Sequence, residues 1–339
     1  MDILSEVLRV VRLSGAIHFR GEFTRPWAFT TSPPQLLAVR LNVPGGSVTP
    51  FHVFVDGRCW VTAQGIPPVR IEPGDVIIVP RADQHVLSSD AGLAPVPISS
   101  IYPQPSREQV TLLRHGGGGA PAHFMCGFLH SDLQFDPLLR ALPGLICVRN
   151  RNGDLALETF DAAGRREVAI ESAAEAAWWQ ASLRYLIAEA ATPGAGNRAV
   201  LARLSESLFL EVLRWQLRHA AHGDGNWLAA LHDPQVGRVL GLMHALPERG
   251  WTTDALAREA AMSRAALGKR FTALVGESPI HYLAGWRMHL ARRLLRETPL
   301  GLAGVAARVG YESEAAFSRA FRRAVGMPPA AWRDARAAG

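Results

Sequence analysis

Residues 263–279 read SRAALGKRFTALVGESP, and residues 313–329 read SEAAFSRAFRRAVGMPP. The second stretch repeats the first fifty positions later, with a serine at its start, a phenylalanine in its middle, and a Val-Gly pair followed by a proline at its end. The serine suits a helix N-cap, the apolar residues recur with helical spacing, and the glycine suits the position that follows a helix. We therefore predict that one helical element occurs twice.

Each copy follows a shorter helical stretch, residues 254–261 and 305–309 respectively. A short helix, a tight turn and a second amphipathic helix are typical of a helix-turn-helix, whose second helix enters the major groove of DNA. Residues 280–297 predict a connecting helix that ends before Thr298-Pro299. Such a helix would hold two recognition helices about 34 Å apart, the separation of successive major grooves. The alternative is two helical hairpins that bind no nucleic acid.

The positive charge is concentrated on this repeat. Residues 251–339 contain 14 Lys and Arg against 7 Asp and Glu, a net charge of +7. The whole chain carries +6, so residues 1–250 carry about −1. A basic C-terminal part beside a neutral remainder favours neutralisation of DNA phosphates.

The second copy contains AARVGYES at 306–313, FSRAFRR at 317–323 and GMPP at 326–329. With these motifs, the stretch from about His232 to Asp334 resembles the AraC/XylS family of bacterial transcription regulators. The resemblance implies a transcription regulator that binds double-stranded DNA in a sequence-specific manner and contacts RNA polymerase. We predict an activator, with repression as the alternative.

The candidate DNA-contacting residues are those on the outward faces of the two recognition helices, together with one residue of the connecting helix. They are Arg264, Ala265, Gly268, Lys269, Arg270, Arg287, Ser313, Glu314, Ala315, Ser318, Arg319 and Arg322. An arginine such as Arg319 can bind guanine with two hydrogen bonds, whereas a phosphate contact would add affinity without sequence choice. Because the first copy presents the small Ala265 and Gly268, we expect the second copy to dominate specificity.

The N-terminal part predicts a different fold. Residues 16–157 contain short Val- and Ile-rich stretches separated by glycine and proline turns, which is typical of an antiparallel barrel or sandwich. Residues 51–85 resemble a cupin: PGDV at 73–76, followed by Pro80 and His85, is close to the second cupin motif, and His52 falls where the first begins.

The predicted fold class is therefore α+β, with an N-terminal cupin-like antiparallel β-barrel, a helical segment, and a C-terminal all-α DNA-binding domain with two helix-turn-helix motifs. The predicted boundaries are 1–160 for the effector-sensing barrel, 161–220 for the helical segment, 221–231 for a linker, and 232–339 for the DNA-binding domain.

Cupin enzymes generally hold a metal with three histidines and a glutamate. Here only His52 and His85 remain of that set, because Phe54 stands two positions after His52 and no glutamate follows at the expected distance. Cys126, His123 or His130 could complete a site from another strand. We predict no metal, no cofactor and no enzymatic activity, so that His52 and His85 are structural histidines or weak metal candidates; a cupin metalloenzyme is the alternative.

The three cysteines, Cys59, Cys126 and Cys147, are too few and too unevenly spaced for a disulfide framework. Cys59 and Cys126 are candidates for a redox pair, with Arg58 lowering the pKa of the Cys59 thiol. The alternative is that each is a small buried apolar residue. Together with His52 and His85, these two cysteines are the candidates for sensing a small molecule or a redox signal; a purely structural barrel on a constitutive DNA-binding protein competes with both.

Residues 172–219 predict helices interrupted at 192–194. The stripe Leu201, Leu204, Leu208, Val212 and Trp215 has the spacing of a helix that pairs with another, which favours a homodimer. The same stripe could instead pack on the preceding helix or the barrel. Because no apolar run approaches the ~20 residues of a membrane span and the N-terminus is charged, we expect no membrane contact and a cytoplasmic location.

Overall fold

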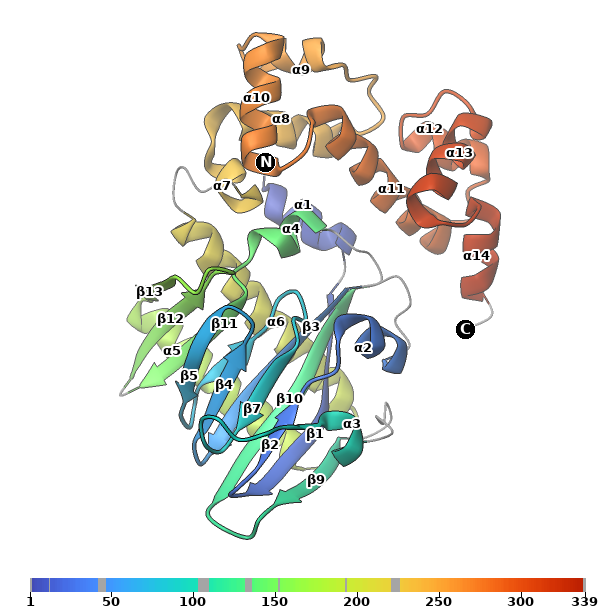
Figure 1. Ribbon diagram of the computed structural model, residues 1–339. Coiled ribbons are helices and arrows are strands. Elements are labelled where there is room, and N and C mark those ends of the chain that lie inside the picture. Colours follow the sequence, from blue (N-terminus) through green and yellow to red (C-terminus); the bar gives the residue numbers. More distant parts are fainter. Residues whose placement is uncertain are drawn as a thin grey trace. The chain divides into compact units, whose positions relative to one another are not determined.

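The computed structural model describes residues 2–11, 13–41, 47–102, 110–131, 136–151, 153–192, 194–220 and 226–337. The chain divides into two compact units (Figure 1). The sheet unit comprises residues 13–134 and 142–219, and the helical unit comprises residues 1–12, 135–141 and 220–339.

The sheet unit contains two sheets. An eight-stranded sheet has the order β13-β12-β11-β6-β3-β10-β1-β9, and a five-stranded sheet has the order β5-β4-β7-β2-β8. The strands of the larger sheet are β1 (Leu13–Thr24), β3 (Ser47–Asp56), β6 (Val76–Ile78), β9 (Thr111–Gly116), β10 (Pro121–Ser131), β11 (Leu145–Arg151), β12 (Asp154–Phe160) and β13 (Arg166–Ile170). Those of the smaller sheet are β2 (Ala28–Thr30), β4 (Cys59–Ala63), β5 (Ile66–Ile71), β7 (His85–Ser88) and β8 (Val96–Pro97).

The predicted α+β class is confirmed, but two details of the predicted barrel were wrong. The strands that the structure describes form two separate sheets and no closed barrel. The sheets are also not purely antiparallel, since β9 pairs with β1 and β8 pairs with β2 in parallel. In each parallel pair the two strands are far apart in the sequence and other strands lie between them, whereas the turn pattern predicts only hairpins between neighbouring strands.

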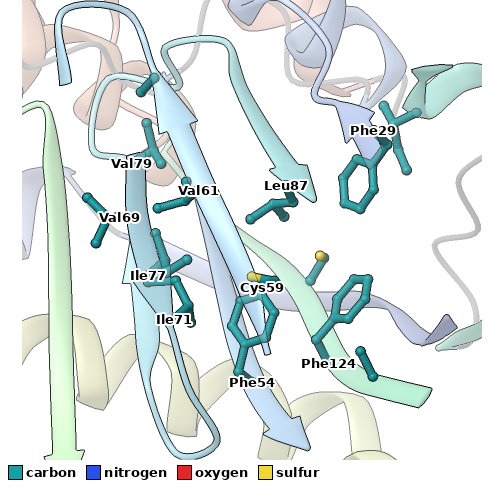
Figure 2. Close-up of a cluster of buried hydrophobic side chains, with 14 of the residues drawn as sticks. Phe29, Phe54, Cys59, Val61, Val69, Ile71, Ile77, Val79, Leu87 and Phe124 are labelled. Atoms are coloured by element: carbon teal, nitrogen blue, oxygen red, sulfur yellow. The ribbon is translucent and has the colours of Figure 1, made fainter. Parts of the chain in front are cut away.

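The main core lies between the two sheets, where side chains from both meet (Figure 2). Phe124 of β10 is at the centre of an aromatic group: its ring is 5.4 Å from Trp27, 5.5 Å from Phe54 and 5.0 Å from Phe23. Offset and edge-to-face ring contacts of this kind add to the stabilisation from burial alone. The core therefore holds the inner faces of the strands, including that of β3, in fixed positions.

Two helices cover the outer face of the larger sheet, α5 (Ala173–Ala191) and α6 (Asn197–His219). Helix α6 approaches β1 so closely that a Cβ added to Gly15 would lie 2.7 Å from the Cβ of Ser205. The rings of Trp179 and Trp215 meet at 5.1 Å between the two helices. Glycine at position 15 thus permits the sheet-to-helix contact that buries this face.

The helical stripe predicted to pair subunits is used inside the chain. Leu201, Leu208, Val212 and Trp215 are buried within the sheet unit. The alternative stated above, packing on the chain itself, is the one observed for these side chains. The predicted helical segment 161–220 also contains a strand, β13, because residues 166–170 extend the sheet by pairing with β12.

A small hydrophobic cluster lies beside the main core and attaches helix α2 (Pro34–Arg40). It contains Leu37, Leu41, Val48 and Ala82. The other face of α2 is exposed, and its N-cap residue makes no side-chain capping hydrogen bond. Helix α2 is therefore held to the sheets mainly by two leucines. Another short helix, α3 (Ile98–Ile101), follows β8.

The helical unit contains α1 (Ile3–Val11), α4 (Asp136–Ala141), α7 (Trp227–His232), α8 (Pro234–Ala245), α9 (Thr253–Glu259), α10 (Arg264–Val275), α11 (Pro279–Glu297), α12 (Leu302–Arg308), α13 (Glu314–Val325) and α14 (Pro329–Ala337). Helix α1, which the sequence assigned to the barrel, packs against α8 and α11 instead. Residues 227–231, assigned to the linker, form most of α7, because buried Trp227 donates a hydrogen bond to Tyr282 at 3.0 Å. The remainder of the predicted linker, 221–225, lies outside the described residues.

Among the helices of the described residues, none is long and apolar enough to cross a membrane.

Candidate DNA-binding surface and effector site

The two predicted repeats form the same local structure. The Oγ of Ser263 accepts a hydrogen bond from the backbone N–H of Ala266 at 3.2 Å, and the Oγ of Ser313 accepts one from Ala316 at 3.2 Å. Helices α10 and α13 therefore begin where the serines predicted. Gly276 and Gly326 end them in the left-handed conformation, at φ of 86° and 84°, because an αL residue satisfies the last helical carbonyls and glycine adopts it without strain.

Each recognition helix buries one face and presents the other to solvent. Leu267, Phe271 and Val275 are buried in α10, and Phe317 and Phe321 are buried in α13. The predicted outward residues Arg264, Ala265, Lys269, Arg270, Glu314, Ala315, Arg319 and Arg322 are exposed, Gly268 and Ser318 are half-buried, and the hydroxyl of Ser313 serves as the cap.

The cationic side chains of this surface differ in what they contact. In the described part of the chain, Lys269, Arg319 and Arg322 form no ion pair. Arg270 instead pairs with Asp233, with 2.6 Å between the guanidinium and the carboxylate. Arg264 lies 3.4 Å from Asp254 in an exposed pair, which is worth little energetically. Lys269, Arg319 and Arg322 are thus available to DNA without losing an ion pair.

Arg287 links the second helix-turn-helix motif to the segment that leads into the first. It lies on the connecting helix α11, where its Nε donates to the carbonyl of Pro247 at 2.7 Å and its Nη2 donates to the carbonyl of Arg249 at 2.8 Å. Its guanidinium also lies 5.9 Å from the ring centre of Tyr311 in the second motif. The predicted role of Arg287 in contacting DNA is untested; the contacts that it makes here are with the segment that leads into the first motif and with Tyr311 of the second.

Gly310 completes this junction. Its φ is +75°, and a Cβ added to it would lie 2.5 Å from Nη2 of Arg287 and 2.8 Å from the carbonyl oxygen of Glu248. The position therefore requires glycine for its conformation and for its space. The sequence gave no signal that this position contacts the segment before the first motif.

Arranged in this way, two capped helix-turn-helix motifs with exposed cations, joined by one helix and attached to a two-sheet unit, define a DNA-binding transcription regulator.

Comparison with known proteins agrees with this class. Residues 2–166 and 166–218 match the cupin family Cupin_6, and residues 256–335 match the helix-turn-helix domain family HTH_18. A protein of Streptomyces lividans named an AraC-like transcription regulator is 33% identical over 87% of this chain and 89% of its own length. A protein of the same description from Streptomyces antibioticus is 30% identical over 98% of each chain. The transcriptional regulator AlkR of Acinetobacter baylyi is 26% identical over 98% of this chain and 99% of its own. The chain belongs to the AraC-like family of transcription regulators.

In the sheet unit, the fold brings three of the four predicted sensing residues together. His52 of β3 has its Nδ1 2.7 Å from Sγ of Cys126 and its Nε2 2.8 Å from Nε2 of His85. The Nδ1 of His85 lies 2.8 Å from the backbone oxygen of Asp83. All three side chains are buried. Because the two nitrogens of His52 point to different partners, the three residues form a chain of hydrogen bonds and do not surround a common point, as metal ligands would.

The donors and acceptors in this series of hydrogen bonds follow from its last member, the backbone carbonyl of Asp83. A carbonyl oxygen can only accept, so the Nδ1 of His85 carries the proton and its Nε2 accepts from the Nε2–H of His52. The Nδ1 of His52 is then free to accept from the Cys126 thiol. Burial lowers the pKa of His85 to about 4 and lowers that of His52 well below its usual value, with His85 adding repulsion. Both histidines are therefore neutral at pH 7.

The cysteines differ from the sequence expectation. Burial raises the pKa of Cys59 and Cys126 well above the usual value, and raises that of Cys147 to about 12. We expected Arg58 to lower the pKa of Cys59, but the thiol is enclosed by the apolar core, which disfavours the thiolate. Cys59 lies in that core on β4 (Figure 2). Its predicted pairing with Cys126 on oxidation is untested.

A cavity of about 40 Å³ adjoins this hydrogen-bonded chain. Its walls come from β1, β2, β3, β10 and the helices α2 and α3, and they consist of Phe19, Phe29, Thr31, Ser32, Leu37, Leu41, Pro50, His52, Ile98, Tyr102, Cys126 and Phe128. Sequence reasoning found only His52 and Cys126 of this set. The other side chains come from segments that carry no cupin motif, so nothing in the sequence marked them.

The two neutral histidines make the stability of the protein depend on pH. For His85, whose pKa falls from 6.5 to about 4 on folding, the unfolded chain binds the additional proton between these values. The free energy of unfolding therefore falls as the pH drops from about 6.5 to about 4, by about 3 kcal/mol from this residue. Urea unfolding at pH 7 and pH 4 would measure it. The His85→Gln variant should lose less stability on acidification than the natural protein, and equal losses would contradict the assignment.

Proposed function

We propose that the sheet unit of this regulator binds a small-molecule effector in the cavity beside His52, and that its occupancy changes the affinity of the helical unit for DNA. A ligand can shift such an equilibrium only if it binds one state better than the other. The cavity supports the proposal because its wall includes α2, the segment held by two leucines. The raised thiol pKa values give less support to a redox signal.

We further propose that sequence choice comes from the exposed faces of α10 and α13. Base contacts are assigned to Arg264, Ala265, Gly268 and Lys269 in the first helix, and to Glu314, Ala315, Ser318 and Arg319 in the second. Phosphate contacts are assigned to Arg322 and to the backbone beside Ser313. Arg270 and Arg287 are assigned to holding the motifs in place. The single observation that carries this proposal is that Arg319 and Arg322 are exposed on a capped recognition helix and form no ion pair with a described residue.

Selection of DNA from a random pool with the full-length protein tests the proposal. We expect enrichment of one motif with two elements spaced by about one helical turn, 10–10.5 base pairs. Recovery of unrelated sequences, or of no DNA above background, would refute sequence-specific binding by these helices.

We also propose that the protein is a homodimer. Since the stripe on α6 is largely buried, the surface of α5 supports the proposal better: Trp178 and Tyr185 are 42% and 53% exposed and lie seven positions apart, on one helix face. Aromatic residues commonly dominate the energy of an interface.

Replacing both Trp178 and Tyr185 by serine is expected to weaken dimerisation at least tenfold, since each aromatic anchor is worth about 2 kcal/mol. Sedimentation equilibrium measures the change. Ile280→Ser, which removes an exposed apolar side chain of the helical unit, is the control and should leave the dimer intact. If the double variant dimerises like the natural protein, the interface lies elsewhere.

The remaining proposals follow from the family. We propose that the protein acts in the cytoplasm as an activator that contacts RNA polymerase and that it has no enzymatic activity. The three relatives described above are all named as transcription regulators, which supports a regulatory role for this chain.

A further inference from the structure

The cavity beside His52 lies between two hydrophobic clusters. Phe19, Phe29, Ile98 and Cys126 belong to the main core between the sheets. On the opposite wall, Leu37 and Leu41 belong to the smaller cluster that attaches α2. A molecule entering here would lie between α2 and the main core.

The described residues of the wall carry no charge. None of its twelve side chains is Asp, Glu, Lys or Arg, and His52 is neutral because burial lowers its pKa. A charged ligand would lose its hydration and find no counter-charge, which costs several kcal/mol. The wall therefore excludes carboxylates, phosphates and amines.

The polar groups of the wall already have partners within the protein. Both ring nitrogens of His52 are occupied by Cys126 and His85. The hydroxyl of Thr31 donates to the carbonyl of His85 at 3.2 Å, and that of Tyr102 lies 3.3 Å from the hydroxyl of Thr111. A sugar or other polyol would bury hydroxyl groups without hydrogen-bond partners, because the polar groups of the wall already bond to other groups of the protein.

The size of the cavity indicates how a ligand would be accommodated. An apolar cavity of about 150 Å³ binds benzene, whereas this one is about 40 Å³. Among the surrounding segments, α2 has few anchoring side chains: its Leu36 and Val39 are 48% and 72% exposed, and it packs on the small cluster through Leu37, Leu41 and the partly buried Ala38. Elements with few buried apolar contacts move at the lowest cost.

From these observations we infer that the effector is a small, uncharged, apolar molecule, comparable in size to a single hydrocarbon ring, which binds between Leu37 and the main core and displaces α2. This inference rests on the proposed function, since it names the class of effector for the same cavity.

Binding of fluorobenzene to the full-length protein, followed by ¹⁹F NMR, tests the inference, with 4-fluorobenzoate as the matched charged probe. We expect the fluorobenzene signal to shift and broaden with added protein, and the fluorobenzoate signal to be unchanged. Equal effects on both probes, or no effect on fluorobenzene, would overturn the inference.

Substitutions on α2 locate the site. Leu37→Trp fills the cavity and should weaken fluorobenzene binding at least tenfold, whereas Leu37→Ala enlarges it and should strengthen binding. Leu36→Trp, on the exposed face of the same helix, is the matched control and should bind like the natural protein. Near-ultraviolet circular dichroism verifies folding, and Leu37→Phe replaces the tryptophan variant if that one fails to fold. Binding that is independent of residue 37 would place the site elsewhere and refute the inference.

The same samples separate this inference from the proposed function. If fluorobenzene binds in a Leu37-dependent way and changes the affinity for selected DNA, both stand. If it binds in that way and DNA affinity is unchanged, the cavity is an apolar site but the proposed gating of DNA binding fails.

Discussion

Gly310→Ala is expected to destabilise the helical unit by about 2–5 kcal/mol, although it adds a single methyl group. The left-handed conformation at Gly310 costs a residue with a side chain about 1–2 kcal/mol. The new Cβ would also lie 2.8 Å from the backbone oxygen of Glu248, which cannot turn aside as a side chain can. Relieving that overlap costs a further 1–3 kcal/mol or so. Urea unfolding of the full-length protein, monitored separately for the two units, measures the loss.

Gly285→Ala is the matched control. Gly285 lies in α11, close to Arg287 in sequence, but no atom approaches the position of its Cβ. Alanine stabilises a helix interior by about 1 kcal/mol relative to glycine. The same substitution should therefore stabilise the unit at position 285 and destabilise it at position 310. Equal effects would contradict the role of Gly310 in the junction of the two motifs.

The junction also predicts a binding phenotype. Because Arg287 donates to the carbonyls of Pro247 and Arg249 and lies beside Tyr311, we expect it to fix the separation of α10 and α13. Arg287→Lys keeps the charge but lacks the planar guanidinium group, whose separate N–H donors reach both carbonyls. This variant should bind DNA with both sequence elements about tenfold less tightly, while its affinity for a single element changes little. A uniform loss on both DNAs would indicate instead that Arg287 contacts phosphate.

Arg319→Ala is expected to remove preference for one base pair of the selected motif. A bidentate contact from arginine to guanine contributes about 1–3 kcal/mol of discrimination, or about 5- to 150-fold in relative affinity. Arg322→Ala, one helical turn later on the same face, is the comparison. It should weaken binding to all sequences alike, and it should lower the number of counterions released on binding, measured from the salt dependence of the affinity, by about one. If Arg319→Ala behaves in the same way as Arg322→Ala, then Arg319 binds phosphate.

The sequence predicted the DNA-binding part closely because its signals are local. Ser263 and Ser313 cap the helices that follow them by accepting a hydrogen bond from the backbone N–H three residues ahead, and Gly276 and Gly326 end these helices. Each helix boundary therefore depends on residues within one turn. Contacts between residues that lie far apart in the sequence were not predicted. Nothing near Arg287 indicates that its partners are carbonyls some forty positions earlier.

The sheet unit shows the same limit. The cupin-like motif located His52 and His85, and the fold placed them 2.8 Å apart. Leu37 and Ile98, which enclose the cavity, come from connections between strands. The stripe on α6 has the period of a helix that pairs with another, but a sheet face satisfies that period equally well, and β1 and α5 are its partners. Periodicity identifies a buried face without identifying what covers it.

The central claim is that the two repeats read one DNA sequence together. Comparing the DNA motifs selected from one random pool by the natural protein and by Arg319→Ala tests it most directly. We expect a motif of two elements for the natural protein, and for the variant a motif that keeps the element of α10 but loses a base preference in the element of α13. A single element for the natural protein, or an identical motif for both proteins, would contradict it.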